Sequence, residues 1–388
     1  MKLNRLRTRY FLVGLTVFLG LALTLASQGA PTRQYLVYLG TYTDHGGKGI
    51  YAFRFDSVSG QLTSLGLAAE SPEPSFLAIS QNRRFLYAAN EILTFNGQPA
   101  GAVSAFAVQP DTGKLSILNQ VSSRDEGPAH ITLDHSGKYV LVSNYTLGSI
   151  AVFSLLPDGR IGQVSSFVQH KGSSVNPERQ QGPHAHAIVL SPDNRYAIAA
   201  DLGLDELLEY PFDVAKGTLG NPQVVKTRPG AGPRHLVFGP TGRFLYVINE
   251  LQSTVVAYTY DARNGRLREL QTISTLPKGL NGENTAGEID VHPSGKFLFA
   301  SNRGDNSIAV FAVDPKRGSL KLLEIDSTRG KTPRNFALDP SGSWLLAANQ
   351  DSDDIVVFRV DSGTGHLTAQ GAMVPAPSPA CIKFVSAP

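Results

Sequence analysis

The chain repeats one pattern of apolar and polar positions six times. In each copy a short apolar run follows a proline or small residue, a tight turn comes next, and a second apolar run ends in Asn or Asp; residues 232–250 (GPRHLVFGPTGRFLYVINE) are one copy. Apolar runs of this length, separated by Gly, Asp and Asn, are typical of antiparallel strands. Aligned on the turn residue, successive copies lie 47 to 57 residues apart, which is the length of a propeller blade. The aligned turn residues are Arg83, Gly137, Asn194, Gly242, Gly295 and Gly342.

Two further apolar runs follow in most copies, one rich in β-branched and aromatic residues and one after a D-x-x-x-G-x-L turn, so each repeat supplies four strands. The chain ends complete a seventh set, because residues 35–39, 49–55 and 61–68 match strands two to four and residues 378–385 match strand one. We therefore predict an all-β, seven-bladed β-propeller over residues 34–388, a single domain whose last blade is closed by strands from both termini.

Residues 1–30 have the layout of a secretory signal peptide. Basic residues at positions 2, 5, 7 and 9 precede an apolar run from Phe11 to Ala26, and small residues follow. An uncleaved signal anchor is the alternative, although 16 residues are few for a membrane-spanning helix. We expect an exported protein, periplasmic or secreted, with no membrane partner unless this segment is retained.

Charge and cysteine content argue against a nucleic-acid-binding protein and against a disulfide-stabilised one. The formal net charge is +3, and loss of the four basic residues near the N-terminus brings it to −1. No run of Lys or Arg suggests nucleic-acid binding. Cys381 is the single cysteine, so there is no internal disulfide. We expect a monomer that acts on a small molecule.

Two rings of positions lie where the first strand of each blade begins and the second ends. One position is nearly constant, and Asn or Asp there is best explained as satisfying local backbone groups. Its members are Asn90, Asn144, Asp201, Asn249, Asn302 and Asn349. The neighbouring positions vary and hold several His, Arg and Glu residues that blade symmetry does not require. Because adjacent strand residues point to opposite sides, only one of each pair can face the channel mouth. Salt bridges between blades and buried structural histidines are the alternatives to a functional role.

The sequence Gly-Pro-His-Ala-His contains one extra residue before its strand, which predicts a β-bulge, a feature common near functional sites. His184 and His186 have a zinc-like spacing, but no third and fourth ligands accompany them. A hard cation held by oxygen atoms of Glu91, Asn144, Asp201 or Asn249 is a further alternative. We expect no metal and no cofactor.

Seven motifs are spread along the chain: GTYT at 40–43, GPHAHA at 182–187, GPRH at 232–235, NE at 249–250, NTAGEI at 284–289, SNRG at 301–304 and TPRNFALDPSG at 332–342. Together they resemble the lactonase family of propellers, which contains bacterial 6-phosphogluconolactonases and fungal carboxy-cis,cis-muconate lactonizing enzymes, and this resemblance covers essentially all of residues 34–388. It implies that the catalytic residues are His186, Arg234, Glu250 and Arg303. Other residues of the two rings are candidates for substrate binding: His184, His235, Glu91, Arg334 and Glu288.

The expected reaction is hydrolysis of a sugar lactone, as in a 6-phosphogluconolactonase, without a covalent intermediate. Glu250 or His186 would activate water, and Arg234 and Arg303 would stabilise an oxyanion or hold an acidic group. No G-x-S-x-G sequence supplies a nucleophile. Lactonisation of a carboxymuconate and a non-enzymatic exported binding module are the alternatives. Export also leaves the identity of the substrate undecided, because phosphorylated sugar lactones are cytosolic.

Overall fold

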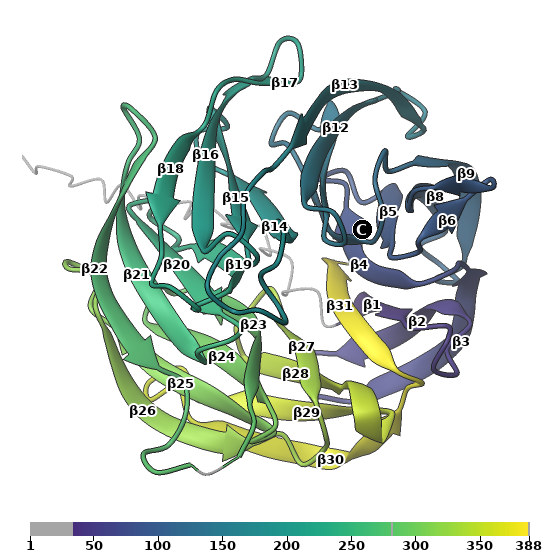
Figure 1. The fold of residues 1–388 in the computed structure, drawn as a ribbon. Helices are drawn as coiled ribbons and strands as arrows, with labels where there is room; N and C mark the ends of the chain where they lie inside the picture. The colour runs from purple at the N-terminus through teal and green to yellow at the C-terminus, as the bar shows by residue number, and fades with distance from the viewer. Residues whose placement is uncertain (1–33, 281, 387–388) are drawn as a thin grey trace, which may run out of the picture. The chain divides into compact units, whose positions relative to one another are not determined.

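The computed structural model describes residues 34–280 and 282–386, and these residues fold as seven radial sheets around a central axis (Figure 1). The predicted seven-bladed propeller is therefore confirmed. Six blades are built in chain order from the innermost strand to the outermost, and in blade 1 a small separate hairpin, β6 (Thr94–Phe95) and β7 (Gln98–Pro99), comes between the second and third strands. The strands are β4 (Pro74–Ile79), β5 (Phe85–Asn90), β8 (Ala102–Val108) and β9 (Leu115–Ser122) in blade 1; β10 (Pro128–Leu133), β11 (Tyr139–Asn144), β12 (Ser149–Leu155) and β13 (Ile161–Gln169) in blade 2; β14 (Ala185–Leu190), β15 (Tyr196–Asp201), β16 (Glu206–Asp213) and the outer pieces β17 (Thr218–Leu219) and β18 (Gln223–Lys226) in blade 3; β19 (Pro233–Phe238), β20 (Phe244–Asn249), β21 (Thr254–Asp261) and β22 (Arg266–Ser274) in blade 4; β23 (Thr285–Val291), β24 (Phe297–Arg303), β25 (Ser307–Val313) and β26 (Leu320–Ser327) in blade 5; and β27 (Pro333–Leu338), β28 (Trp344–Asn349), β29 (Asp354–Val360) and β30 (Leu367–Pro375) in blade 6.

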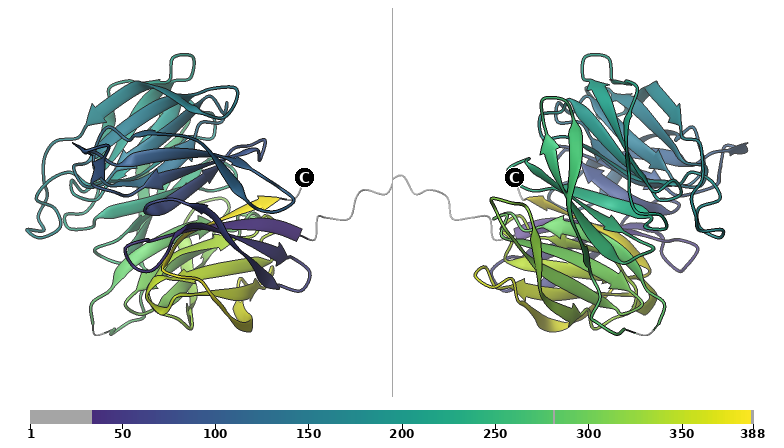
Figure 2. Two further views of the ribbon diagram at one scale, coloured as in Figure 1. Left: turned by 90° about the vertical axis from the view of Figure 1, so that its right-hand side faces the viewer. Right: turned by 60° about the vertical axis from the view of Figure 1, so that its left-hand side comes forward.

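The seventh blade joins the two ends of the described chain. Its order is β3 (Leu62–Glu70), β2 (Gly49–Asp56), β1 (Gln34–Thr41) and β31 (Pro379–Ser386), with β31 innermost. β1 and β31 pair antiparallel from Tyr35 opposite Ser386 to Thr41 opposite Pro379, and Figure 2 shows the yellow β31 beside the purple β1. The predicted closure from both termini is confirmed, and it gives the seventh blade four strands like its neighbours.

Apolar side chains of neighbouring blades pack against one another. Both faces of each sheet are covered as a result. The junction of blades 6 and 7 is an example: Trp344 packs edge-to-face on Phe55 at 5.9 Å between ring centroids, and its indole nitrogen donates to Ser57 O at 2.8 Å. Gly60 lies against the same indole with φ of 77°, and a Cβ there would approach the ring to 2.3 Å. This junction therefore helps to hold the closing blade against its neighbour.

The turn residue that defines the repeat has a left-handed backbone in every copy. Its φ is 61° at Asn194 and 68° at Gly242, which explains why Gly, or a residue that tolerates this conformation, recurs there. The turn sets the register of the first two strands in each blade. The position at which the second strand ends is consequently the same in all six copies.

The constant Asn and Asp side chains bond within the walls of the blades. Asn302 donates to Thr275 O at 2.9 Å, and Asp201 accepts from the backbone of His184 at 2.8 Å and lies 2.6 Å from His170. These bonds tie the end of the second strand to the loop that enters the blade, in agreement with the structural interpretation.

Every inner strand is bulged at its start. In β19 the register passes from Pro233 opposite Asn249 to His235 opposite Ile248, so Arg234 is the extra residue, and His186 has the same place in β14. The predicted bulge at His186 is present, but because all seven inner strands have one, it does not single out this histidine. The bulge instead aims one residue of each blade toward the channel mouth.

The predicted signal segment, residues 1–30, lies outside the described residues. Among those that are described, no helix has the length and apolar character needed to cross a membrane.

Candidate active site

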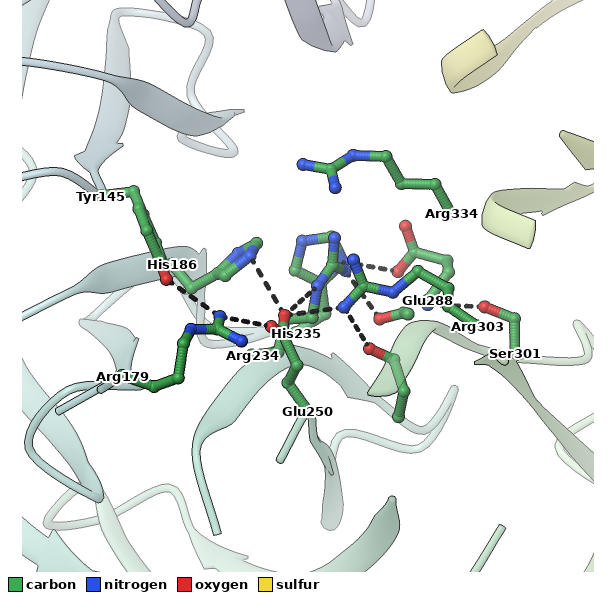
Figure 3. Close-up of polar contacts among 12 residues, drawn as sticks. Tyr145, Arg179, His186, Arg234, His235, Glu250, Glu288, Ser301, Arg303 and Arg334 are labelled. Carbon is green, nitrogen blue, oxygen red and sulfur yellow. Dashed lines mark hydrogen bonds and ion pairs between the residues drawn. The ribbon is translucent and has the colours of Figure 1, made fainter. Parts of the chain in front are cut away.

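Glu250 is the centre of a buried charged cluster at one end of the channel (Figure 3). It directly follows β20 and is 5% exposed. Its Oε2 accepts from Arg234 Nε at 3.1 Å and lies 2.8 Å from Arg303 Nη2, while its Oε1 accepts from Arg179 Nη2 at 2.7 Å. A carboxylate at this depth requires such partners, because unpaired burial of a charge is very costly.

Backbone carbonyls of blade 5 fix the two inner arginines. Arg234, the bulged residue of β19, donates through Nη1 to Gly287 O at 2.7 Å. Arg303, at the end of β24, donates through Nη2 to Ala286 O at 2.8 Å. The cluster is thus assembled from adjacent blades, and the bulges of β19 and β23 set its geometry.

The charges determine the protonation of Glu250. Burial alone would raise its pKa, but the guanidiniums of Arg303 and Arg234 outweigh burial and hold the pKa well below the usual value. For His186, burial and then Arg234 lower the pKa well below its ordinary value. At neutral pH the site therefore contains an ionised Glu250 beside a neutral His186.

His186 lies over Glu250, with Nε2 3.9 Å from Glu250 Oε2. Its ring contacts Tyr145 and His235 edge-on, at centroid distances of 5.3 and 5.1 Å. Its buried Nδ1 has no hydrogen-bond partner among the described residues. The gap between Nε2 and Oε2 is too long for a direct hydrogen bond and suits one water molecule in contact with both atoms.

Arg334 differs from the other arginines of the cluster because its guanidinium makes no hydrogen bond to any described residue. It is the bulged residue of β27, it packs at 4.9 Å on the ring of Tyr42, and its Nη2 lies 4.0 Å from Glu91 Oε2. Glu91 is itself occupied by the hydroxyl of Tyr42 at 2.8 Å. In Figure 3 Arg334 extends above Arg303 without a dashed line to any residue drawn. Its donors are available to a ligand.

His235 and Glu288 lie on the other side of the inner strands. His235 Nδ1 is 2.8 Å from Glu288 Oε1, and the other carboxylate oxygen accepts from Asn335. These three side chains line a channel cavity of about 680 Å³ together with Asp290 and Lys383. None of the residues that contact Glu250 lines this cavity. The structure therefore divides the candidate residues between the channel mouth and the channel interior.

His184 supports the mouth without facing Glu250. Its ring stacks on Tyr145 at 4.7 Å between centroids, and its Nδ1 lies 2.9 Å from Tyr145 O. The structure brings together His186, Arg234, Glu250 and Arg303, with Arg334 and Glu91 next to them. It places His184 behind Tyr145.

Three residues of the mouth were not selected from the sequence: Tyr42, Tyr145 and Arg179. Tyr145 occupies the same repeat position as Glu91 and Glu250, and Tyr42 lies in the GTYT motif. The repeat and the motif therefore pointed to these two residues. Arg179 lies in the loop between β13 and β14, where no repeat position exists. Nothing in the repeat could have identified it.

The alternative oxygen ligands of a metal ion lie at the ends of strands in four different blades. Asp201 lies 2.6 Å from His170, and Asn144 and Asn249 donate through Nδ2 to Ser123 O, Ser149 and Thr254, while their Oδ1 atoms have no hydrogen-bond partner among the described residues. Within residues 34–280 and 282–386, the one close group of three His, Cys, Asp or Glu side chains is Glu324, Asp326 and His366, on the outer strand β26 and the turn before β30. Catalysis without a metal remains a prediction.

Comparisons with known protein families, sequences and structures all indicate the same family. Residues 36–384 match the family described as "Lactonase, 7-bladed beta-propeller". The chain is 35% identical over 352 residues to a protein of Bacillus subtilis (strain 168) named 6-phosphogluconolactonase, covering 91% of this chain and 99% of that protein. The solved structure of a periplasmic gluconolactonase from Pseudomonas aeruginosa has 36% identity and a TM-score of 0.85, covering 92% of this chain and 100% of that one. That of a putative 6-phosphogluconolactonase from Bacteroides fragilis has 36% identity and a TM-score of 0.84, covering 91% and 98%. The chain therefore belongs to the lactonase family of seven-bladed β-propellers.

Proposed function

We propose that this protein is a lactonase that hydrolyses a sugar lactone at the Glu250 cluster. The observation that carries the proposal is a buried carboxylate, kept ionised by Arg234 and Arg303, with neutral His186 3.9 Å away. Relatives named 6-phosphogluconolactonase and gluconolactonase support the same reaction class.

In the proposed reaction a water oxygen attacks the lactone carbonyl carbon. A proton leaves the water, a tetrahedral oxyanion forms, and the ring C–O bond then breaks. The released alkoxide oxygen takes up the proton that the base removed from the water, and the product is an open-chain hydroxy acid. The protein must therefore supply a base, donors for the oxyanion and a proton for the leaving oxygen.

Glu250 is the proposed base and holds the water together with His186. Because its carboxylate is ionised, it can accept a proton over a wide pH range, although its low pKa makes it a weak base. His186 Nε2 lies close enough to contact the same water molecule. His186 as the base, with Glu250 stabilising the imidazolium, is the alternative assignment.

Arg334 is the proposed donor to the lactone carbonyl oxygen, with Arg234 and Arg303 supplying further positive potential. A donor without a partner before the reaction loses no hydrogen bond when it binds the developing oxyanion. Stacking on Tyr42 restricts where the Arg334 guanidinium can lie. Removal of one such donor typically costs about 10²–10³-fold in kcat.

The charge of the mouth favours an acidic substrate. Four arginines, at positions 179, 234, 303 and 334, face two carboxylates, Glu91 and Glu250. The excess of two positive charges in a largely buried site favours a lactone with a phosphate or carboxylate group. The same excess would suit a carboxymuconate, so lactonisation of such a compound is the second candidate. A lactone available outside the cytoplasm fits the proposed export, for which the periplasmic Pseudomonas relative is the support.

The test is a hydrolysis assay with gluconolactone, 6-phosphogluconolactone and muconolactone, each with and without EDTA. We expect the purified protein to hydrolyse at least one sugar lactone above the spontaneous rate, and EDTA to leave the rate unchanged. Loss of activity in EDTA, restored by Ca²⁺, would contradict the metal-free mechanism. Absence of hydrolysis, with formation of carboxymuconolactone from carboxymuconate, would favour lactonisation.

A further inference from the structure

Arg179 is unlike the other arginines that hold Glu250. It comes from the loop between β13 and β14, and its side chain is 39% exposed, against 2% for Arg234 and 12% for Arg303. Its Nη2 donates to Glu250 Oε1 at 2.7 Å and to the Tyr145 hydroxyl at 3.2 Å. Figure 3 shows Arg179 reaching Glu250 from the side of Tyr145, opposite Arg334. Of the side chains that the structure describes next to Glu250, it alone lies at the solvent boundary.

The backbone around Arg179 is firmly anchored. Buried Gln180 donates to Leu202 O at 2.8 Å, and Ser174 donates to Asp205 at 2.6 Å. The amide of Arg179 itself donates to Asn176 Oδ1 at 3.0 Å. A change in the contacts of Arg179 therefore requires rotation of its side chain alone, and the loop does not have to open.

The two oxygens of Glu250 are bound differently. Oε2 lies between Arg234 and Arg303, which are buried and held by backbone carbonyls. Among the described residues, Arg179 alone binds Oε1. The two inner arginines already neutralise Glu250, so the third positive charge is in excess and is available to another anion.

We propose that Arg179 is a positioning and selectivity residue of this site: it holds Glu250 Oε1 in the free protein and turns onto the acidic substituent of an anionic lactone when one binds. This inference rests on the proposed lactonase function. With the carbonyl oxygen at Arg334 and the acidic group at Arg179, the lactone ring would lie over His186 and Glu250. The rotation would also remove a hydrogen bond from the carboxylate of Glu250, the proposed base.

Arg179 also affects the protonation of Glu250. The charged and titratable groups around this carboxylate are Arg234 from β19, Arg303 from β24, His186 from β14, Arg179 from the loop, Tyr145 after β11 and, farther away, Arg334 from β27. Loss of a positive charge next to Oε1 raises the pKa of Glu250. Because the base acts when it is ionised, the acid limb of kcat/KM would then move to higher pH.

The test compares Arg179→Met and Arg179→Lys with Arg228→Met, which removes an exposed arginine from the loop between β18 and β19. kcat and KM are measured for 6-phosphogluconolactone and gluconolactone between pH 3.5 and pH 8. For Arg179→Met we expect KM for the phosphorylated lactone to rise about tenfold or more, KM for the uncharged lactone to change less than about twofold, and the acid limb to move up with both. Arg179→Lys should restore part of each effect, and Arg228→Met should resemble the original protein. Equal KM changes with both lactones, or an acid limb that does not move, would overturn the inference.

A second measurement does not depend on turnover. Titration calorimetry with 6-phosphogluconate and gluconate should give tighter binding of the phosphorylated acid to the original protein and to Arg228→Met, and loss of this preference in Arg179→Met. A preference that survives in Arg179→Met, or that the original protein lacks, would overturn the role of Arg179. If no lactone is hydrolysed but the preference depends on Arg179, the proposed reaction fails while Arg179 remains the anion-recognition residue.

Discussion

The mouth of the channel and its interior use adjacent residues of the same inner strands in opposite ways. At the mouth, Arg234 and Arg334 leave an excess of positive charge around Glu250, and the Arg334 guanidinium has no hydrogen bond to a described residue. In the interior, Glu288 is hydrogen-bonded by the residues that directly follow these two arginines, His235 and Asn335. The donors of Arg334 left unpaired at the mouth support the ligand site proposed there, whereas both oxygens of Glu288 accept hydrogen bonds, as expected of a structural carboxylate.

The largest effect is expected from Arg234→Ala. It removes one of the two buried cations that keep Glu250 ionised, so we expect lactone turnover to fall by at least about 10³-fold. Glu250 would still be paired with Arg303 and Arg179, and the protein should therefore remain folded. Steady-state kinetics with circular dichroism checks both parts. Full activity in this variant would exclude the mouth as the reaction site.

Arg334→Met is expected to lower kcat by about 10²-fold, with a smaller change in KM, because its donors act mainly on the oxyanion. Methionine keeps part of the packing on Tyr42. The measurement is kcat and KM with the best lactone substrate. A rise in KM with unchanged kcat would instead identify Arg334 as a ground-state binding residue.

The unaltered protein should keep its activity at acidic pH. The pKa of Glu250 is held well below 4.5, and a carboxylate base is active above its pKa. We therefore expect kcat/KM to stay flat down to about pH 4.5 and to fall only below it. An acid limb between pH 6 and pH 7 would favour a histidine with an unperturbed pKa as the base.

The smallest effect is expected in the channel interior. Burial, and then Glu288, raises the pKa of Asp290 to about 7. The folded protein thus binds this proton more tightly than the unfolded chain does, and the raised pKa costs stability as the pH rises from about 4 to about 7. Asp290→Asn should therefore raise the melting temperature by about 1–3 °C at pH 8 and have little effect at pH 4. Thermal unfolding at both pH values is the measurement, and equal shifts would show that the carboxylate charge is not the cause.

The repeat made most of the fold predictable. The positive-φ turn residues, such as Gly242, fix the strand register, and the closing strand could be recognised because residues 378–385 lacked their own partners. The same alignment identified Glu250, Arg234, Arg303 and His186 as departures from symmetry, and the structure brings these four together. Their catalytic role remains a proposal.

What the sequence did not reveal depends on local geometry. Adjacent residues were expected to face opposite sides, but which of Arg234 and His235 faces the mouth is decided by the bulge of β19. Arg179 reaches Glu250 from a loop with irregular sequence, and its position depends on Gln180 and Asn176 rather than on a periodic pattern. Contacts of this kind become visible only in three dimensions.

The comparison between mouth and interior is tested most directly by the same isosteric change in two buried glutamates. Lactone hydrolysis is measured for Glu250→Gln and Glu288→Gln under identical conditions, with melting temperatures as the control for folding. We predict that Glu250→Gln lowers kcat/KM by about 10³-fold or more, while Glu288→Gln lowers the melting temperature and keeps kcat/KM within about tenfold. Equal losses in the two variants, or a larger loss in Glu288→Gln, would contradict the assignment of the reaction to Glu250.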